Sequence, residues 1–422
     1  MKLCIKNGRV LDPASGFDKT ACVNIEDGII KSVGEAETAD ETIDASGKLV
    51  LPGLIDLHVH FREPGREDQE TIAGGCRIAA KSGYTSVVTM PNTNPPIDNQ
   101  ALVKFIKHEA EKSGLLNIFP AAAVSKGMKG EEISEMGELF TAGAVAFTDD
   151  GKPISSSILM RRALEYSRMF DVPIMAHEED HLLVDSGVIN EGKVSASLGL
   201  RGIPNAAEEV MIARDVIIAE LSKGRLHVQH ISSGGSVEII RNAKKRGVNV
   251  TCETAPHYFS LTDEVVREKL ALAKMNPPLR TEDDRMKIIE GLKDGTIDAI
   301  ATDHAPHLMN EKRQEIEFAP NGIIGLETAV PLMITKLVKE KGFSYNEVFA
   351  KVTCNPAKII NIKKGEIKAG YDADLVIIDP DKKVIINDDF IASNCKNTPF
   401  MGAELCGSVE CTILSGRITY KA

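Results

Sequence analysis

Strand-length apolar runs alternate with helical stretches of about 15 residues from residue 49 to about residue 360, and no other feature limits the possible folds as strongly. The eight runs are LVLPGLIDLHVH, YTSVVTMPN, LNIFPAAAV, AVAFTDD, VPIMAHEE, RLHVQHIS, VNVTCETAPH and IDAIATDHAPH. Apolar strands separated by helices indicate βαβ units and a parallel sheet. Eight such repeats predict an α/β fold of the (β/α)8 TIM barrel type, whose usual size is about 250 residues.

The two ends of the chain follow a different pattern, in which apolar and polar residues alternate between turn signals. Asn-Gly, Asp-Gly and Ser-Gly pairs punctuate the first 50 residues, and the pattern returns after residue 364. Such pairs predict hairpins and short antiparallel strands. We therefore expect a composite small β domain from residues 1–50 plus 365–422, and a barrel from residues 51–364 inserted between the two parts.

Charge and cysteine content exclude several classes of protein. The formal net charge is −11, which is the wrong sign for binding phosphate backbones or an anionic bilayer by bulk charge. An anionic substrate would need local cations. The eight cysteines form no C-x-x-C pair, so we expect reduced, mostly packed thiols. No apolar run approaches the roughly 20 residues that span a bilayer, so we expect a soluble, cytoplasmic protein.

Polar side chains gather at the carboxyl ends of seven of the eight runs. They are His58, His60, Asn92, Asp149, Asp150, His177, His230, Glu253, His257, Asp303 and His307. In a (β/α)8 barrel the chemistry sits at this face, because the βα loops and strand ends converge there. Apolar strands also end in polar residues where they meet solvent, and that interpretation would be preferred for a single strand. It does not account for seven ends that carry imidazole, carboxylate or amide groups.

Six of these side chains predict a metal centre. They are His58, His60, Asp150, His177, His230 and Asp303. An H-x-H pair on a strand points both rings to one face. Four imidazoles with two carboxylates and no cysteine favour Zn2+ over a thiolate-bound zinc or an all-oxygen site, although cobalt or manganese could use the same ligands. Six ligands exceed the needs of one tetrahedral ion, so of one or two ions per chain we prefer two, about 3.5 to 4 Å apart and bridged by a carboxylate.

Neighbouring residues leave some assignments open. His227 and His230 are three apart, so strand parity places only one of them inside the barrel, and we choose His230 because it lies nearer the strand end. Asp149 and Asp150 are alternatives for the bridging carboxylate. The acidic run 178–180 is interpreted as a charge cluster at a helix N-terminus, where the helix dipole favours it.

The motifs that carry these residues resemble those of dihydroorotases in the cyclic amidohydrolase superfamily. DLHVHFREPG (56–65) and ATDHAPHLMNEK (301–312) are similar to two long motifs of the family. Further segments are similar in the family's order: MPNTNPP (90–96), FTDDGKP (147–153), MAHEED (175–180), VQHIS (228–232), NPPLR (276–280), APNGIIGLETAVPL (319–332) and, in the superfamily's C-terminal β segment, GEIKAGYDADLVIID (365–379). The resemblance covers nearly the whole chain and implies a metal-dependent barrel with a small β domain from both termini.

The resemblance also implies roles for individual residues. It implies metal binding by the six ligands named above. The substrate contacts that it implies are Arg62, Asn92 and His307 for a carboxylate, and Asn276, Asn321 and Gly322 for a dihydropyrimidine ring. Many relatives bridge two metals with a carboxylated lysine, but this chain has Thr148-Asp149-Asp150 there, so it resembles the class of dihydroorotases that uses aspartate.

The implied reaction is the zinc-dependent, reversible hydrolysis of (S)-dihydroorotate to N-carbamoyl-L-aspartate, a step of pyrimidine (UMP) biosynthesis. A metal ion can lower the pKa of water to about 7 and polarise the amide carbonyl. Asp303 is our candidate general base, which takes a proton from water and returns it to the leaving nitrogen. Arg62 can offer a carboxylate a bidentate fork, which lysine cannot, and its alternative is a salt bridge to Glu63 or Glu67.

Other functions are weighed against this one. A related cyclic amidohydrolase of the allantoinase or dihydropyrimidinase/hydantoinase type is the nearest, and the carboxylate clamp and the missing bridging lysine separate the two. An inactive homologue that scaffolds aspartate transcarbamoylase is disfavoured by the complete ligand set. A metal-storage protein would leave Arg62 and Asn92 unexplained. We leave open a homodimer, an association with aspartate transcarbamoylase, and whether the charged segment 309–322 is an active-site lid or a solvated loop.

Overall fold

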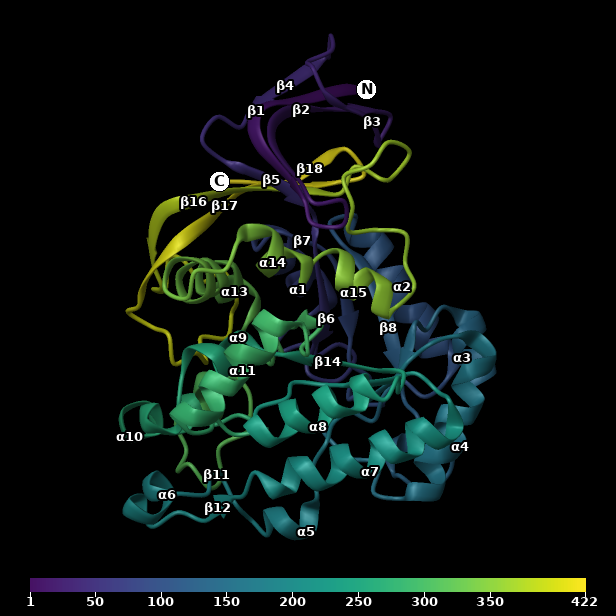
Figure 1. Ribbon diagram of the computed structural model, residues 1–422, viewed down its shortest axis with the longest axis vertical. Coiled ribbons are helices and arrows are strands. Elements are labelled where there is room, and N and C mark those ends of the chain that lie inside the picture. Colours follow the sequence, from purple (N-terminus) through teal and green to yellow (C-terminus); the bar gives the residue numbers. More distant parts are fainter.

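A small β sheet lies at one end of a barrel of parallel strands in the computed structural model, which describes residues 1–422 (Figure 1). Both chain ends belong to this sheet, so the purple and yellow segments of Figure 1 lie side by side. Its strands are β1 (Lys2–Asp12), β2 (Phe17–Glu26), β3 (Ile29–Gly34), β4 (Glu41–Asp44), β5 (Leu49–Pro52), β16 (Leu375–Ile385), β17 (Glu404–Leu414) and β18 (Arg417–Lys421). β16 pairs antiparallel with β5, which confirms that the two ends build one sheet.

Two details of this sheet differ from the expected strands. β1 pairs antiparallel with β2, as expected, but it is parallel to β4 and β5, because the β2–β3 hairpin carries the chain back before these strands begin. The run LVLPGLIDLHVH divides at Gly53 between the sheet and the barrel. A side chain at Gly53 has no room, since its Cβ would lie 2.2 Å from Oγ1 of Thr85. The domain boundaries at residues 50 and 365 stay predictions.

Eight parallel strands form the barrel in chain order. They are β6 (Leu54–Val59), β7 (Tyr84–Thr89), β8 (Asn117–Ala122), β9 (Ala146–Phe147), β10 (Ile174–Ala176), β13 (Leu226–Val228), β14 (Val250–Thr254) and β15 (Ala299–Ile300). Each lies within one of the eight apolar runs, and a parallel bridge between Val59 and His304 brings the end of the last strand to the first. The (β/α)8 fold predicted from the sequence is therefore confirmed.

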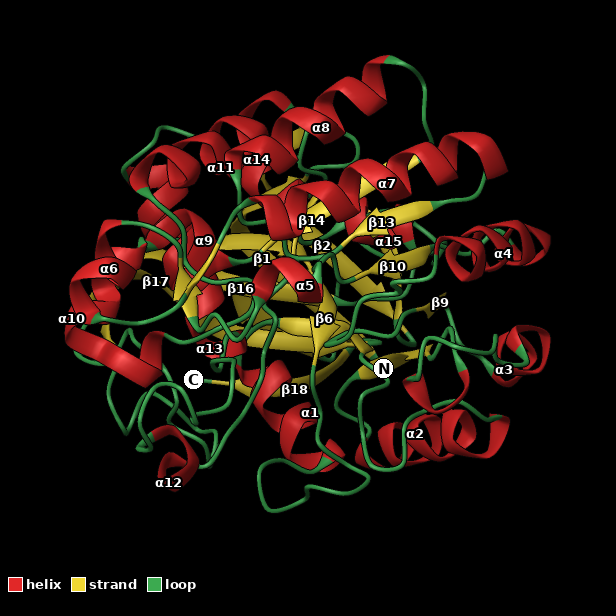
Figure 2. Cartoon of the chain, turned by 90° about the horizontal axis from the view of Figure 1, so that it is seen from below, coloured by secondary structure: helices red, strands yellow, loops and turns green.

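Helices surround the central strands, as Figure 2 shows. The longer ones are α1 (Ile72–Lys81), α2 (Gln100–Ser113), α3 (Met136–Ala142), α4 (Ser157–Ser167), α7 (Ala206–Ser222), α8 (Gly234–Lys245), α11 (Glu282–Asp294) and α13 (Leu326–Leu332). Shorter elements are α5 (His181–Val184), α6 (Lys193–Leu198), α9 (Pro256–Ser260), α10 (Val266–Lys269), α12 (Met309–Lys312), α14 (Tyr345–Ala350), α15 (Cys354–Ile359), β11 (Ile189–Asn190) and β12 (Gly202–Ile203). None of the helices has the length and apolar character needed to cross a bilayer. All eight cysteines are free, as expected.

One strand shows how the two parts pack together. In β16, Leu375 and Ile377 are buried in the core of the small sheet, whereas Val376 and Ile378 are buried against the barrel. Successive side chains of a strand point to opposite faces, so two of these four residues pack into the small sheet and the other two pack against the barrel. Each such burial contributes about 1.5–3 kcal/mol. The small sheet is thereby fixed to the amino end of β6, and the carboxyl ends of the parallel strands are left for the loops that carry the polar residues.

Candidate metal centre and active site

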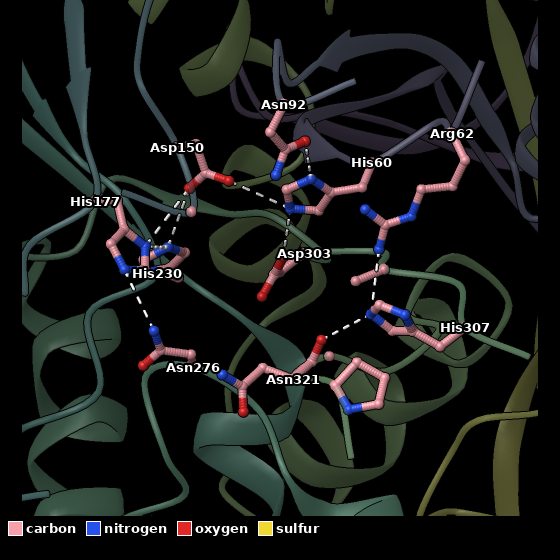
Figure 3. A pocket seen from close by; sticks show the side chains of 14 residues that line it. His60, Arg62, Asn92, Asp150, His177, His230, Asn276, Asp303, His307 and Asn321 are labelled. Carbon is pink, nitrogen blue, oxygen red and sulfur yellow. Dashed lines mark hydrogen bonds and ion pairs between the residues drawn. The ribbon is translucent and has the colours of Figure 1, made fainter. Parts of the chain in front are cut away.

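The carboxyl ends of five barrel strands bring the six candidate ligands into one buried cluster, and Figure 3 shows five of them, all except His58. They are His58 and His60 at the end of β6, Asp150 after β9, His177 after β10, His230 after β13 and Asp303 after β15. Their donor atoms form two overlapping trios that could each hold a metal ion, and Asp150 belongs to both.

The first trio consists of His58, His60 and Asp150. Nε2 of His58 lies 3.2 Å from Nε2 of His60, and Oδ2 of Asp150 lies 3.3 and 3.4 Å from these two nitrogens. Oδ1 of Asp303 is 3.1 Å from Nε2 of His60 and 3.6 Å from Nε2 of His58. Two imidazoles and two carboxylates therefore converge on one point.

The second trio consists of Asp150, His177 and His230. Here Oδ1 of Asp150 lies 3.4 Å from Nε2 of His230 and 3.7 Å from Nδ1 of His177. The two imidazole nitrogens are 2.9 Å apart. The two oxygens of Asp150 thus face different pairs of histidines, which is the arrangement that a bridging carboxylate needs.

The polar atoms of this cluster fit a bound cation. Oδ1 of Asp150 is buried and has no hydrogen-bond partner, although buried polar atoms are normally bonded. Burial alone would lower the pKa of His177, but Asp150 and Glu179 raise it to about 10. The site therefore stabilises positive charge, and its nitrogen and oxygen donors suit a divalent metal ion.

Three further residues hold the imidazole rings. Oε1 of Glu253 lies 3.0 Å from Nδ1 of His58, Oδ1 of Asn92 lies 2.9 Å from Nδ1 of His60, and Oε2 of Glu179 lies 2.9 Å from Nε2 of His177. In each ring the nitrogen that faces the cluster is the one left free by this bond. Such bonds fix the tautomer and the orientation of a metal ligand.

Glu253 bridges two histidines, since its Oε2 also lies 3.1 Å from Nε2 of His227. Burial would raise the pKa of Glu253, but His227 and His58 lower it to about 2. Both His227 and His230 therefore turn toward the barrel interior, and the parity argument for His227 is wrong. β13 ends at Val228, and His230 has a positive φ of 33°, so the alternation of a strand stops before His230.

The residues of the acidic run 178–180 have different roles in the structure, and so do the neighbouring aspartates Asp149 and Asp150. Only Asp180 caps a helix, accepting from the backbone of α5. Glu179 instead accepts from His177 and from the side-chain amide of Asn276, so the helix-cluster interpretation is wrong for it. Asp149 accepts from the backbone N of Ser125 at 3.0 Å, away from the imidazoles, which leaves Asp150 as the aspartate of the cluster.

Asp303 is aimed into the site by a strained backbone and a buried clamp. Its φ is 50°, a left-handed value that an aspartate adopts at a cost of about 1–3 kcal/mol. Asp56 accepts from N and Oγ1 of the preceding Thr302, at 3.0 and 2.6 Å, and also from N of His58 at 3.1 Å. Asp56 thereby ties the end of β15 to the end of β6 and fixes Asp303 relative to His58.

A polar cavity of about 300 Å³ opens over these residues (Figure 3). The residues that the resemblance assigned to substrate all line it: Arg62, Asn92, Asn276, His307, Asn321 and Gly322. Five of the six candidate ligands line it too: His60, Asp150, His177, His230 and Asp303. The structure therefore places the candidate metal centre and the candidate substrate contacts in one cavity.

Arg62 stands partly buried in the cavity wall opposite the second trio. Its Nε donates to the carbonyl O of Pro306 at 3.2 Å, and burial lowers its pKa. The expected alternative of a salt bridge is wrong, because Glu63 accepts from the backbone N of Ile72 and Glu67 accepts from that of Gly65. The guanidinium is left facing the cavity without a carboxylate.

His307 lies beside Arg62 and is neutral. Burial and the charge of Arg62 lower its pKa to about 3. Its Nε2 lies 2.8 Å from the carbonyl O of Asn321, so this nitrogen carries the proton and donates. Nη2 of Arg62 is 3.3 Å from the same nitrogen. The wall around Arg62 thus offers hydrogen-bond donors and a cation.

Comparisons with known proteins identify the family. A family model described as dihydro-orotase-like matches residues 47–236, and one described as amidohydrolase family matches residues 320–420. The dihydroorotase of Acetivibrio thermocellus is 51% identical over 421 residues, which cover 99% of both chains. The chain belongs to the dihydroorotase family. The dihydroorotase of Geobacter metallireducens is also 51% identical and is matched over 100% of both chains.

Solved structures of other proteins share the fold of this chain. The L-hydantoinase (dihydropyrimidinase) of Arthrobacter aurescens has a TM-score of 0.89 at 25% identity, with 99% of this chain and 95% of that chain covered. The dihydropyrimidinase of Brevibacillus agri, at 22% identity and a TM-score of 0.83 over 99% of this chain and 95% of that chain, shares the fold. As a dihydroorotase-family member, the chain is a metal-dependent cyclic amide hydrolase with a small-molecule substrate.

Proposed function

We propose that this chain catalyses the reversible hydrolysis of the cyclic amide of (S)-dihydroorotate to N-carbamoyl-L-aspartate, in pyrimidine biosynthesis. One observation carries the proposal: a single cavity has the candidate metal centre at one end and the unpaired guanidinium of Arg62 at the other. Dihydroorotate presents a hydrolysable amide and a carboxylate on one small ring, which match these two ends. Full-length relatives named dihydroorotase support the same substrate.

We assign the substrate carboxylate to Arg62, Asn92 and His307. Arg62 offers two parallel N–H donors in a fixed fork that matches a carboxylate. Asn92 uses its Oδ1 for His60, which leaves its amide NH₂ free to donate into the cavity. His307 carries its proton on Nε2 and would transfer the hydrogen bond from the carbonyl of Asn321 to the substrate. Asn276 and the backbone of Asn321 and Gly322 then meet the ring.

We assign two Zn2+ ions to the two trios. One would be held by His58, His60 and Asp150 with Asp303 nearby, and the other by Asp150, His177 and His230. Bound ions of this kind supply Lewis acidity, which lowers the pKa of water to about 7 and polarises a carbonyl oxygen. The sharing of Asp150 and its unpartnered Oδ1 support two ions rather than one.

Asp303 is the proton carrier in this assignment. The His60 and His58 imidazoles outweigh the effect of burial and hold the pKa of Asp303 well below its usual value. Its carboxylate is therefore ionised and can accept the proton of the attacking water. Asp303 then returns this proton to the ring nitrogen as the C–N bond breaks, so the nitrogen leaves as the neutral NH₂ of the carbamoyl group. The clamp by Asp56 keeps the carboxylate at one place through both transfers.

The hydantoinase or allantoinase alternative fits the fold but leaves a charge unexplained. A ring without a carboxylate would leave Arg62 without an anionic partner in the cavity, and such unpaired charges are costly. A homodimer, an association with aspartate transcarbamoylase and a cytoplasmic location stay predictions.

A two-direction assay tests the proposal. Purified protein of known metal content is assayed with dihydroorotate and with N-carbamoyl aspartate, before chelation, after chelation and after Zn2+ is restored. We expect turnover in both directions that is lost with the metal and regained with it. Hydantoin, dihydrouracil and allantoin serve as comparison substrates. Turnover of one of these without turnover of dihydroorotate would overturn the substrate assignment.

A further inference from the structure

A buried lysine lies behind one wall of the active-site cavity. Pro320, Asn321 and Gly322, at the end of the segment 317–322, form this wall. Lys312, at the end of α12, is 2% exposed. Its Nζ donates to three main-chain carbonyls, those of Pro320 at 2.9 Å, Gly322 at 3.1 Å and Lys274 at 3.1 Å. All three N–H bonds of the ammonium are thus used to hold the wall.

A second buried lysine continues this attachment. Lys274 is 6% exposed, and its Nζ donates to the carbonyls of Glu317 at 3.2 Å and Ala319 at 2.8 Å. Its own carbonyl accepts from the backbone N of Gly322 at 3.0 Å. The main chain of the segment 317–322 is therefore held by two ammonium groups, although several of its side chains, such as that of Phe318, are exposed.

Neither ammonium is paired with a carboxylate. The hydrogen bonds of both go only to carbonyl oxygens, and burial together with the charge of Lys274 lowers the pKa of Lys312 to about 7. Burying an unpaired cation is costly, whereas an apolar side chain of similar length would avoid the cost of the buried charge but would leave the carbonyl of Pro320 without its donor. Arg62 is a third cation on this side of the cavity, and it too faces no carboxylate. An anionic ligand in the cavity would lie near these cations and would be favoured by their charge.

We propose that Lys312 is a positioning residue for the carboxylate end of the substrate. It holds Pro320–Gly322 against the cavity through its carbonyl bonds, and its unpaired charge favours a substrate that is anionic at this end. The carbonyl of Asn321, in the middle of the held segment, orients His307. Lys312 therefore acts on the substrate through the loop and through His307 rather than by contact. This inference rests on the proposed function for the identity of the substrate.

The test compares two charge-removing variants of adjacent residues. Lys312→Met removes the buried ammonium, and Arg313→Met removes an exposed cation at the next position as the matched control. We expect Lys312→Met to raise the KM for dihydroorotate at least about tenfold while kcat falls by no more than about threefold, because the carboxylate contacts are the same in the ground and transition states. Arg313→Met should change neither. Metal content is measured in both.

Hydrogen exchange of the backbone amides supplies a readout that needs no substrate. We expect the amides of 317–322 to exchange faster in Lys312→Met than in wild type and Arg313→Met, with the metal-ligand segments unchanged. If Lys312→Met does not fold, Lys274→Met is subjected to the same comparison, since it removes the other ammonium under the same segment.

Three results would overturn the proposal: a KM within about twofold of wild type in the folded variant, an equal rise in Arg313→Met, or unchanged exchange of 317–322. Failure of the proposed function would look different. Wild-type protein would then not turn over dihydroorotate, while the exchange comparison would still decide whether Lys312 positions the loop.

Discussion

Replacing Arg62 with alanine removes the only cation that faces the cavity directly. Its guanidinium meets no carboxylate, so in the proposed complex it is free to give two charge-assisted hydrogen bonds to the substrate. Each such bond is worth about 1.5–3 kcal/mol, so the two together are worth about 3–6 kcal/mol. At about 1.4 kcal/mol per factor of ten, this corresponds to a loss of about 10²- to 10⁴-fold in kcat/KM.

For Arg62→Ala we expect a loss of kcat/KM in the lower part of that range. Asn92 and His307 remain to hold the carboxylate, and the partly exposed site admits water that replaces part of the lost bonding. We therefore expect a loss of about 10²- to 10³-fold, most of it in KM, because the carboxylate is not altered by the reaction. Arg62→Lys keeps the charge but not the fork and should fall between wild type and Arg62→Ala.

The assay is initial-rate kinetics on metal-analysed protein, with Arg77→Ala as the control. Arg77 is an exposed arginine on α1, and its loss should leave both kinetic constants unchanged. Equal metal content in all variants shows that the centre is intact. An unchanged KM in Arg62→Ala would refute the assignment of Arg62 to the substrate carboxylate. It would also refute the main reason to prefer dihydroorotate over an uncharged ring as the substrate.

Three further predictions concern the metal centre and the loop. Asp303→Asn should abolish turnover while metal analysis still finds the ions bound, and activity near that of wild type would exclude Asp303 as the proton carrier. Glu253→Gln should weaken metal binding about 10- to 100-fold in a chelator competition, because Glu253 orients His58, whereas unchanged affinity would reduce it to a packing residue. Because the pKa of Lys312 is lowered to about 7, its charge is lost as the pH rises from about 6 to about 8. Over this pH range the KM of wild type should rise and approach that of Lys312→Met. A ratio of the two KM values that stays constant over the same range would contradict this prediction.

The barrel and the ligands could be predicted from the sequence because both depend on local patterns. Eight apolar runs fix the strands, and a histidine or aspartate directly after a run must lie at the strand end. The same argument could not choose between Asp149 and Asp150, since that choice depends on Ser125, which captures Asp149 from another loop. Nor could it place His227, because the end of β13 interrupts the strand alternation.

The residues that hold the ligands could not be assigned because their partners are far away in the sequence. Glu253 meets His58 across 195 positions, and Asp56 meets Thr302 across 246. No local sequence pattern indicates either pairing, although both Glu253 and Asp56 are polar residues within predicted strands. Lys312 is a similar case, since its helix looks solvated in sequence and only the fold turns it under the cavity wall. A functional role for a buried charged residue is therefore recognised from its contacts in the folded structure rather than from its place in the sequence.

The distribution of charge in the cavity also bears on the direction of the reaction. Arg62 makes one end cationic, Lys312 and Lys274 lie behind the wall formed by Pro320–Gly322, and the donor cluster around Asp150 is suited to divalent cations at the other end. Dihydroorotate carries one carboxylate, but its hydrolysis creates a second one at the amide end. A cavity that is positive at both ends therefore matches N-carbamoyl aspartate as well as dihydroorotate, although the protein as a whole carries a net charge of −11. Because the equilibrium constant does not depend on the enzyme, Arg62→Ala must lower kcat/KM by the same factor in both directions. Unequal factors would mean that one of the two assays reports something other than this site.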